Sequence, residues 1–93
     1  MIIKEKQIEY ILNQINKRLS YSVEKYKPYR INNSLVSNIG HYHLQKAYGR
    51  YRVLQVVNEQ GGVRDVSMSG TKFETYTFLQ GMLEALQTLE TRV

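Results

Sequence analysis

The sequence has no cysteine, one proline and one aspartate among its 93 residues. Without cysteine there is neither a disulfide framework nor a thiolate zinc site, which fits a reducing compartment. Asp65 is the single aspartate, so the sequence offers few candidates for a pair of carboxylates that could catalyse hydrolysis. The first residues, MIIKEKQIEY, are charged from Lys4 onward and lack the apolar core of a signal peptide. We therefore expect a cytoplasmic protein without a membrane span.

The rest of the composition is that of an ordinary globular protein. Hydrophobic residues make up 42% of the chain and charged residues 23%, a balance that argues against a disordered chain. A chain of this length has enough surface for one small core. We therefore expect a single domain over residues 1–93, and no internal repeat or low-complexity tract divides it.

Positive charge exceeds negative charge by five, and the excess lies in the first two thirds of the chain. Residues 1–30 carry seven basic and three acidic side chains (+4), residues 31–60 three and one (+2), and residues 61–93 three and four (−1). This distribution favours a polyanionic partner, although solvated lysines spread over a surface give the same total.

Two segments have the apolar periodicity of helices. In the first, Ile8, Ile11, Ile15 and their apolar neighbours recur on one helical face, which predicts a helix over residues 3–19. The second begins with Thr71-Lys72-Phe73-Glu74, which has the Thr-x-x-Glu spacing of a capping box. It predicts a helix over residues 71–90.

The apolar stripe of the helix predicted over residues 71–90 is wide. Leu79, Leu83 and Leu86 share one face, and Phe78, Met82, Ala85 and Leu89 extend the stripe beside it. Such a stripe is broader than the sheet of a small domain covers, so a homodimer through helix 71–90 is a further prediction.

Three segments predict an antiparallel meander: His41 to Ala47, Tyr51 to Asn58, and Val63 to Met68. A short strand is also predicted within Ser20 to Tyr29, ended by Pro28 because proline cannot donate to a ladder. The stretch from 31 to 40 is either a partly packed loop or one irregular strand. The fold class is therefore α+β, with a three- or four-stranded antiparallel sheet and both helices packed on one face.

No catalytic or metal site is legible in the sequence. His41 and His43 alternate on one side of a predicted strand, but further metal ligands would have to be carboxylates such as Asp65 or Glu59. We expect both to be ordinary surface or half-buried histidines. Gly70-Thr71-Lys72 lacks the spacing of a phosphate-binding loop. We therefore expect a non-enzymatic protein without cofactor or metal.

Tyrosines alternate with basic residues in two parts of the chain, and these residues are the predicted contact surface. Tyrosine stacks on bases while arginine and lysine contact phosphates, so the pattern suits single-stranded nucleic acid or an RNA loop. It equally suits a protein interface, and tyrosines are also common in ordinary strands. The predicted contact residues are Tyr26, Lys27, Tyr29, Arg30, Tyr48, Arg50, Tyr51 and Arg52.

Residues 41–82 contain the segment YGRYR, the hairpin N-x-x-GGV-x-DV and the helix start T-K-x-E-x-Y-x-x-L-x-GM. Through these motifs the chain resembles a group of small, functionally uncharacterised proteins encoded by phages or prophages. The resemblance implies a mobile-element origin and no particular activity. The predicted order of helix, three strands and helix is also similar to the double-stranded RNA binding domain. The motifs argue against that family, because the second helix opens with Thr71-Lys72-Phe73-Glu74 rather than with a basic cluster.

Overall fold

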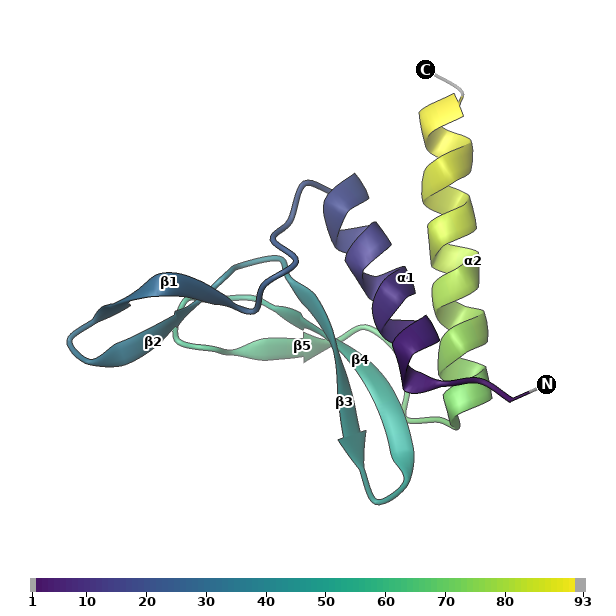
Figure 1. Ribbon diagram of the computed structural model, residues 1–93, viewed down its shortest axis with the longest axis horizontal. Coiled ribbons are helices and arrows are strands. Elements are labelled where there is room, and N and C mark those ends of the chain that lie inside the picture. Colours follow the sequence, from purple (N-terminus) through teal and green to yellow (C-terminus); the bar gives the residue numbers. More distant parts are fainter. Residues whose placement is uncertain (1, 92–93) are drawn as a thin grey trace.

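The structure, a computed structural model, describes residues 2–91, with side chains through residue 89. Two helices frame five strands within this range (Figure 1). The predicted α+β class is confirmed, and both helix predictions agree with the observed bounds to within two residues. The elements in chain order are α1 (Glu5–Arg18), β1 (Tyr26–Ile31), β2 (Ser34–Ser37), β3 (Tyr42–Ala47), β4 (Arg50–Val56), β5 (Val63–Asp65) and α2 (Lys72–Thr91).

The capping box predicted at the start of α2 is confirmed. The Thr71 amide donates to Glu74 Oε1 at 2.9 Å, and the Glu74 amide donates to Thr71 Oγ1 at 3.1 Å. These reciprocal bonds satisfy two amides that the first helical turn leaves without partners. They also hold the pKa of the Glu74 carboxyl below its usual value. Neither helix, over the residues described, has the length and apolar content to cross a membrane.

The predicted meander is present as a sheet with the order β3-β4-β5, in which both pairs are antiparallel. Tyr48 and Gly49 form the turn between β3 and β4 with φ values of 54° and 74°. Positive φ at both positions matches the type I′ turn that fits the strand twist. β5 is shorter than predicted and ends at Asp65. The chain still returns alongside β4, where Tyr51 and Gly70 exchange two backbone hydrogen bonds of 2.8 Å.

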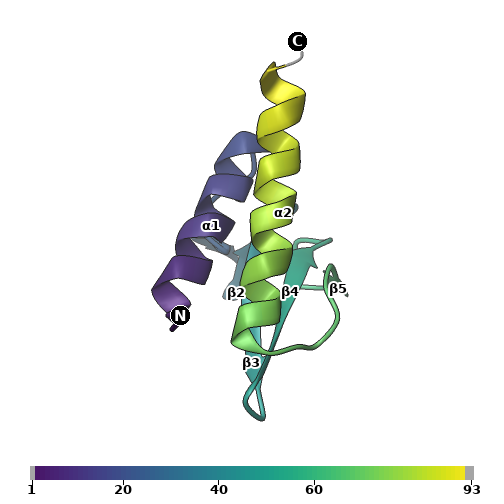
Figure 2. The same ribbon diagram turned by 90° about the vertical axis from the view of Figure 1, so that its right-hand side faces the viewer.

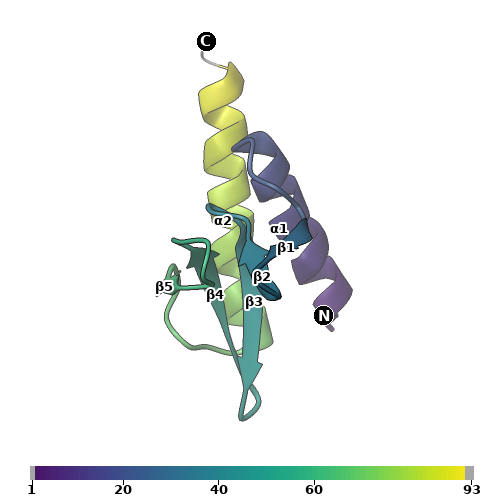
Figure 3. The same cartoon turned by 90° about the vertical axis from the view of Figure 1, so that its left-hand side faces the viewer.

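Both helices cover one face of this sheet (Figures 1, 2 and 3). α1 packs on β3, α2 packs on β4, and the helices pack on each other. The hydrophobic core lies between these layers, because the apolar stripes of both helices and the inward side chains of β3 and β4 meet there. Its buried members are Ile3, Ile8, Ile11, Leu12, Ile15, Tyr42, Val53 and Leu79.

Asn16 is the polar exception on the buried face of α1. Its side chain is fully buried, and Oδ1 accepts the Tyr42 amide at 2.8 Å. Its Nδ2 donates to the Tyr42 carbonyl at 3.1 Å. Asn16 therefore occupies the place of a neighbouring strand along the open edge of β3, and it satisfies both backbone groups of Tyr42.

The predicted strand within Ser20 to Tyr29 is wrong in its bounds, and the stretch from 31 to 40 is more regular than predicted. β1 and β2 pair with each other in a separate two-stranded sheet. Pro28 lies inside β1 rather than at its end. It is tolerated because the register shifts between Tyr26 and Arg30, so the strand bulges there and needs no donor from proline.

This β1–β2 hairpin, residues 26–37, projects from the side of the molecule and is called the arm below (Figure 1). Two hydrogen bonds hold its base: the Ser37 amide donates to Glu59 O at 2.9 Å, and the Asn38 amide donates to Lys25 O at 2.8 Å. Val36 and Ser37 are buried at the base, whereas the rest of the arm is exposed or half-buried. The arm is thus an appendage that the main core does not include.

Candidate nucleic-acid interface

The structure separates the eight predicted contact residues into two groups. Tyr26, Lys27, Tyr29 and Arg30 lie in β1 of the arm. The other four lie at the β3–β4 turn and in β4. The arm and the β3–β4 turn are the ends of two different hairpins that point in different directions in Figures 1 and 3. The predicted residues therefore do not form one continuous face.

The backbone of the arm follows from its turn sequence. Asn32 and Asn33 have φ values of 52° and 64°. Asparagine adopts left-handed conformations more readily than most residues, and two in succession form a type I′ turn. The turn sets the register in which Ile31 pairs with Ser34 and Arg30 pairs with Leu35. The tip of the arm is thus a regular two-stranded ribbon.

Each exposed tyrosine of the arm carries a lysine over its ring. Lys25 Nζ lies 5.3 Å from the ring centroid of Tyr26, and Lys27 Nζ lies 5.9 Å from that of Tyr29. Both distances fall within the range of cation–π attraction. The rings therefore help to keep two ammonium groups together on the arm, where each can also contact an anion.

The arm lies within a long stretch that has no acidic residue. From residue 25 to residue 58 the sequence contains no aspartate or glutamate, while it contains six basic residues. Three of these, Lys25, Lys27 and Arg30, belong to the arm or its base, and no carboxylate among the described side chains, residues 2–89, forms an ion pair with them. Arg30 Nη1 donates to Asn33 O at 3.4 Å and the two lysines lie over tyrosine rings, so these contacts leave the three positive charges without a neutralising carboxylate.

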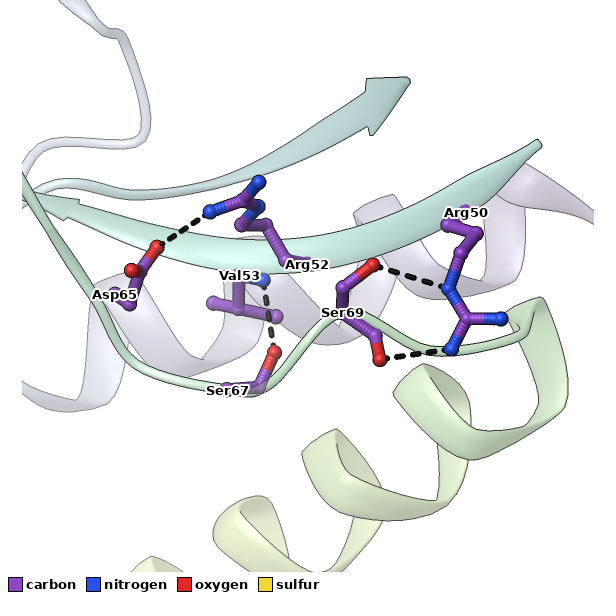
Figure 4. A network of polar contacts seen from close by, with 6 residues as sticks. All are labelled: Arg50, Arg52, Val53, Asp65, Ser67 and Ser69. Atoms are coloured by element: carbon purple, nitrogen blue, oxygen red, sulfur yellow. Dashed lines mark hydrogen bonds and ion pairs between the residues drawn. The ribbon is translucent and has the colours of Figure 1, made fainter. Parts of the chain in front are cut away.

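The basic residues near the β3–β4 turn have partners within the protein. Arg50 donates from Nε to Ser69 Oγ at 3.2 Å and from Nη2 to Ser69 O at 3.0 Å (Figure 4). Arg52 Nη1 lies 3.1 Å from Asp65 Oδ1. These contacts hold segment 65–70 against β4, together with the Ser67 hydroxyl, which accepts the Val53 amide at 2.9 Å. Arg50 and Arg52 thus have a structural role within the protein, which accounts for these two residues without an external partner.

Tyr51, one of the predicted contact residues, is buried rather than exposed. Tyr51 is 6% exposed, and its hydroxyl donates to Glu5 Oε1 at 3.1 Å. Lys46 donates to the same carboxylate oxygen at 2.9 Å. Hydrogen bonds from Lys46 and Tyr51 lower the pKa of the Glu5 carboxyl. By contrast, Tyr48 is fully exposed at the turn, so it alone of this group presents a free ring.

His41 and His43 stack on each other, with ring centroids 5.8 Å apart and an angle of 10° between their planes. His41 is buried, and its Nδ1 lies 2.8 Å from Ser22 O. Burial, with the positive charge of Lys25 nearby, lowers the pKa of His43 to about 4. No group of three or more metal-ligating side chains is found among residues that the structure describes. The two rings therefore form a stacked pair beside the start of β3.

Sequence reasoning missed the residues at the tip of the arm. Ile31 and Leu35 are 53% and 46% exposed. They flank the Asn32–Asn33 turn, in the stretch whose structure the sequence left open. Two turn-forming asparagines between β-branched and aliphatic residues are a hairpin signal, and it would have located the tip.

Comparison of the chain with models of protein families, with curated proteins and with solved structures found no match.

Proposed function

We propose that the protein binds nucleic acid through its arm, without catalysing a reaction, as an accessory protein of a phage or prophage. The origin rests on the resemblance of residues 41–82. The binding surface is narrower than the eight residues predicted from the sequence: it consists of Lys25, Tyr26, Lys27, Tyr29 and Arg30. The β3–β4 turn contributes only Tyr48.

One observation carries this proposal: a projecting two-stranded ribbon and its base carry three cations, the exposed Arg30 and the half-buried Lys25 and Lys27, and no carboxylate among the described side chains pairs with them. Unpaired cations on a narrow projection favour a polyanion, because each phosphate contact releases condensed counterions. Two-stranded ribbons are also elements that some DNA-binding proteins place in a groove of the duplex. Tyrosine hydroxyls beside the lysines add hydrogen-bond donors for phosphate oxygens.

The test is the salt dependence of binding to a mixed-sequence DNA duplex and to its single strands. Affinity is expected to fall steeply between about 50 and 200 mM salt. The double variant Lys27→Ala/Arg30→Ala should weaken binding and reduce the slope of log K against log salt by about 2. The control is Lys6→Ala, an exposed lysine in the first turn of α1 and outside the arm.

The control should leave the slope within about 1 of the wild-type value. Absence of binding to every nucleic acid at low salt would reject the proposal. Equal effects of the arm variant and the Lys6 variant would show that only the net charge matters, which would reject the arm as the binding surface.

A homodimer through α2 is a second candidate, and the exposed flank of that helix favours it. Phe78, Met82, Ala85 and Leu89 follow the 4-3-4 spacing of a coiled-coil seam. Phe78 is 40% and Leu89 60% exposed, and Ala85 is exposed between them. Consider an antiparallel dimer whose two-fold axis passes between residues 83 and 84. In this dimer Phe78 of one copy lies opposite Leu89 of the other, and Met82 lies opposite Ala85. Each large side chain at the centre then faces a small one, as close packing requires.

The absence of cysteine from the chain makes this geometry testable by cross-linking. A mixture of Phe78→Cys and Leu89→Cys proteins should form a mixed disulfide faster than either protein alone forms a symmetric one. The seam is only about 17 Å long, so the interface is small and the dimer should dissociate on dilution. A single monomeric species in sedimentation at all concentrations, with no preference for the mixed disulfide, would exclude it.

A further inference from the structure

We infer that the arm enters the minor groove of A·T-rich duplex DNA, and that Ile31 and Leu35 insert between base pairs and bend the duplex. This inference rests on the proposed function, because it assigns a mode of binding and a substrate class to the same arm. It is carried by the composition and the exposure of the arm tip.

The tip combines the two kinds of side chain that minor-groove proteins use. Arg30, Asn32 and Asn33 are donors suited to the adenine N3 and thymine O2 acceptors on the floor of an A·T-rich minor groove. Ile31 and Leu35 are aliphatic side chains of the kind that unstack base steps. All of them lie within six consecutive residues around one turn. A narrow A·T minor groove also has an enhanced negative potential, which attracts the arginine.

The fold does not account for the exposure of the two aliphatic side chains. Ile31 is 53% and Leu35 46% exposed, and neither belongs to the main core. They line a groove of about 320 Å³ together with Glu59 and Gln60 of the β4–β5 turn. Ile31 pairs with Ser34 and Leu35 pairs with Arg30, so each face of the ribbon tip carries one aliphatic side chain. Insertion of these two side chains between base pairs would bury both of them.

The tyrosines of the arm favour a duplex over a single strand. Single-strand binding relies on open aromatic faces on which successive bases stack. Here Lys25 lies over the ring of Tyr26, and Lys27 lies over the ring of Tyr29. Stacking on those faces would displace the lysines from the rings. With the lysines in place, the same residues present ammonium groups to the two phosphate backbones that border a groove.

The experiment uses a duplex of about 20 base pairs with a dye at each end, in an A·T-rich and in a G·C-rich version. Binding of the full chain should raise energy transfer between the dyes on the A·T-rich duplex, because bending shortens the distance between its ends. The double variant Ile31→Ala/Leu35→Ala should lose at least half of that rise and bind on the order of tenfold more weakly. Its salt slope should not change, because it removes no cation.

Ile39→Ala is the matched control, since Ile39 is an aliphatic residue of similar exposure, 55%, outside the arm. It should bind and bend the duplex as the wild type does. A minor-groove ligand such as distamycin should compete with the protein. Circular dichroism of each variant checks that the fold is retained.

The possible outcomes separate the inference from the proposed function. Binding without a change in energy transfer, tighter binding to the single strand, or equal binding to both duplexes would overturn the inference and leave the arm as a nucleic-acid surface. Failure to bind any nucleic acid would remove the proposed function as well. Loss of energy transfer in the arm variant but not in the Ile39 control would support both.

Discussion

At the scale of single residues, two polar side chains in or beside this small core, Asn16 and Tyr51, have specific partners. The Asn16 amide bonds both backbone groups of Tyr42, so it joins α1 to the edge of the main sheet. The Tyr51 hydroxyl reaches Glu5 at the start of the same helix. In each case a buried or half-buried polar group has its hydrogen bond supplied by a neighbouring element.

Replacement of Asn16 by leucine is expected to lower the free energy of unfolding by about 2 to 4 kcal/mol. The new side chain has a similar volume, but the Tyr42 amide and carbonyl lose their partners in a buried place. Urea unfolding followed by circular dichroism measures the change. The matched control is Asn13→Leu on the exposed side of α1, which should stay within about 0.5 kcal/mol of the wild type. Equal losses in both variants would contradict the role assigned to Asn16.

His43 should make the protein less stable as the pH falls from about 6.5 toward 4. Its pKa is lowered from 6.5 to about 4 in the folded chain. The unfolded chain therefore binds this proton more readily, and protonation favours unfolding over that range. The slope stays below about 1.4 kcal/mol per pH unit, because one proton is involved and the ring keeps some contact with solvent.

Nuclear magnetic resonance titration of the His43 imidazole measures this pKa directly. The variant His43→Gln should show a shallower loss of stability between pH 6.5 and 4 than the wild type. A midpoint near 6.5 for His43 would contradict the burial that the structure assigns to its ring.

At the scale of elements, side-chain hydrogen bonds define the start of α2, whereas a glycine lowers the helix propensity of its middle. Thr71 and Glu74 cap the first turn with reciprocal hydrogen bonds. Gly81 then interrupts the helix interior, where glycine costs about 1 kcal/mol relative to alanine. Apart from its chain neighbours and the backbone of its own helix, no heavy atom lies within 4 Å of the position that a Cβ at Gly81 would take.

Gly81→Ala is therefore expected to raise the free energy of unfolding by about 0.5 to 1 kcal/mol. Thermal unfolding at low protein concentration measures it on the monomer. Gly40→Ala provides the contrast, because Gly40 has a φ of 94° and an added Cβ would meet the ring of Tyr21. That variant should be destabilised. If Gly81→Ala lowered the free energy of unfolding instead, the space beside Gly81 would have to be filled by other atoms of the protein.

At the scale of the whole molecule, the chain divides into a packed body and a projecting arm. The described elements span 45 × 41 × 20 Å, and the arm accounts for much of the width in Figure 1. The body buries the apolar faces of two helices against a three-stranded sheet, whereas the arm is a two-stranded ribbon. A two-stranded ribbon is at best marginally stable by itself.

Backbone amides in the arm should therefore exchange with solvent faster than those paired between β3 and β4. The arm opens locally by breaking few contacts, while the β3–β4 amides need wider unfolding. Hydrogen exchange followed by nuclear magnetic resonance compares the two. Asn33→Gly creates the Asn-Gly sequence preferred in type I′ turns, so it should slow exchange in the arm alone. Equal protection of arm and body in the wild type would contradict this division.

Much of the fold is readable from local patterns. The periodicity of Ile8, Ile11 and Ile15 predicts α1, and the Thr71 to Glu74 spacing predicts the start of α2. Alternation and turn residues predict the meander of β3, β4 and β5. These features depend on residues close in sequence, so a single sequence contains the information. Asn16 could not be recognised in the same way, because its partner Tyr42 lies far along the chain.

The sequence by itself determined that Tyr51 lies on the opposite face of the strand from Arg50 and Arg52, because side chains alternate along a strand. Which side is inside was decided only by tertiary structure. The helices dock on the face that carries Tyr51 and Val53, so the tyrosine is buried and the arginines bond to segment 65–70. Likewise, the Asn32–Asn33 turn makes a hairpin locally. That this hairpin stands outside the core, with no ion pair between its cations and a carboxylate among the described side chains, follows from where the rest of the chain packs.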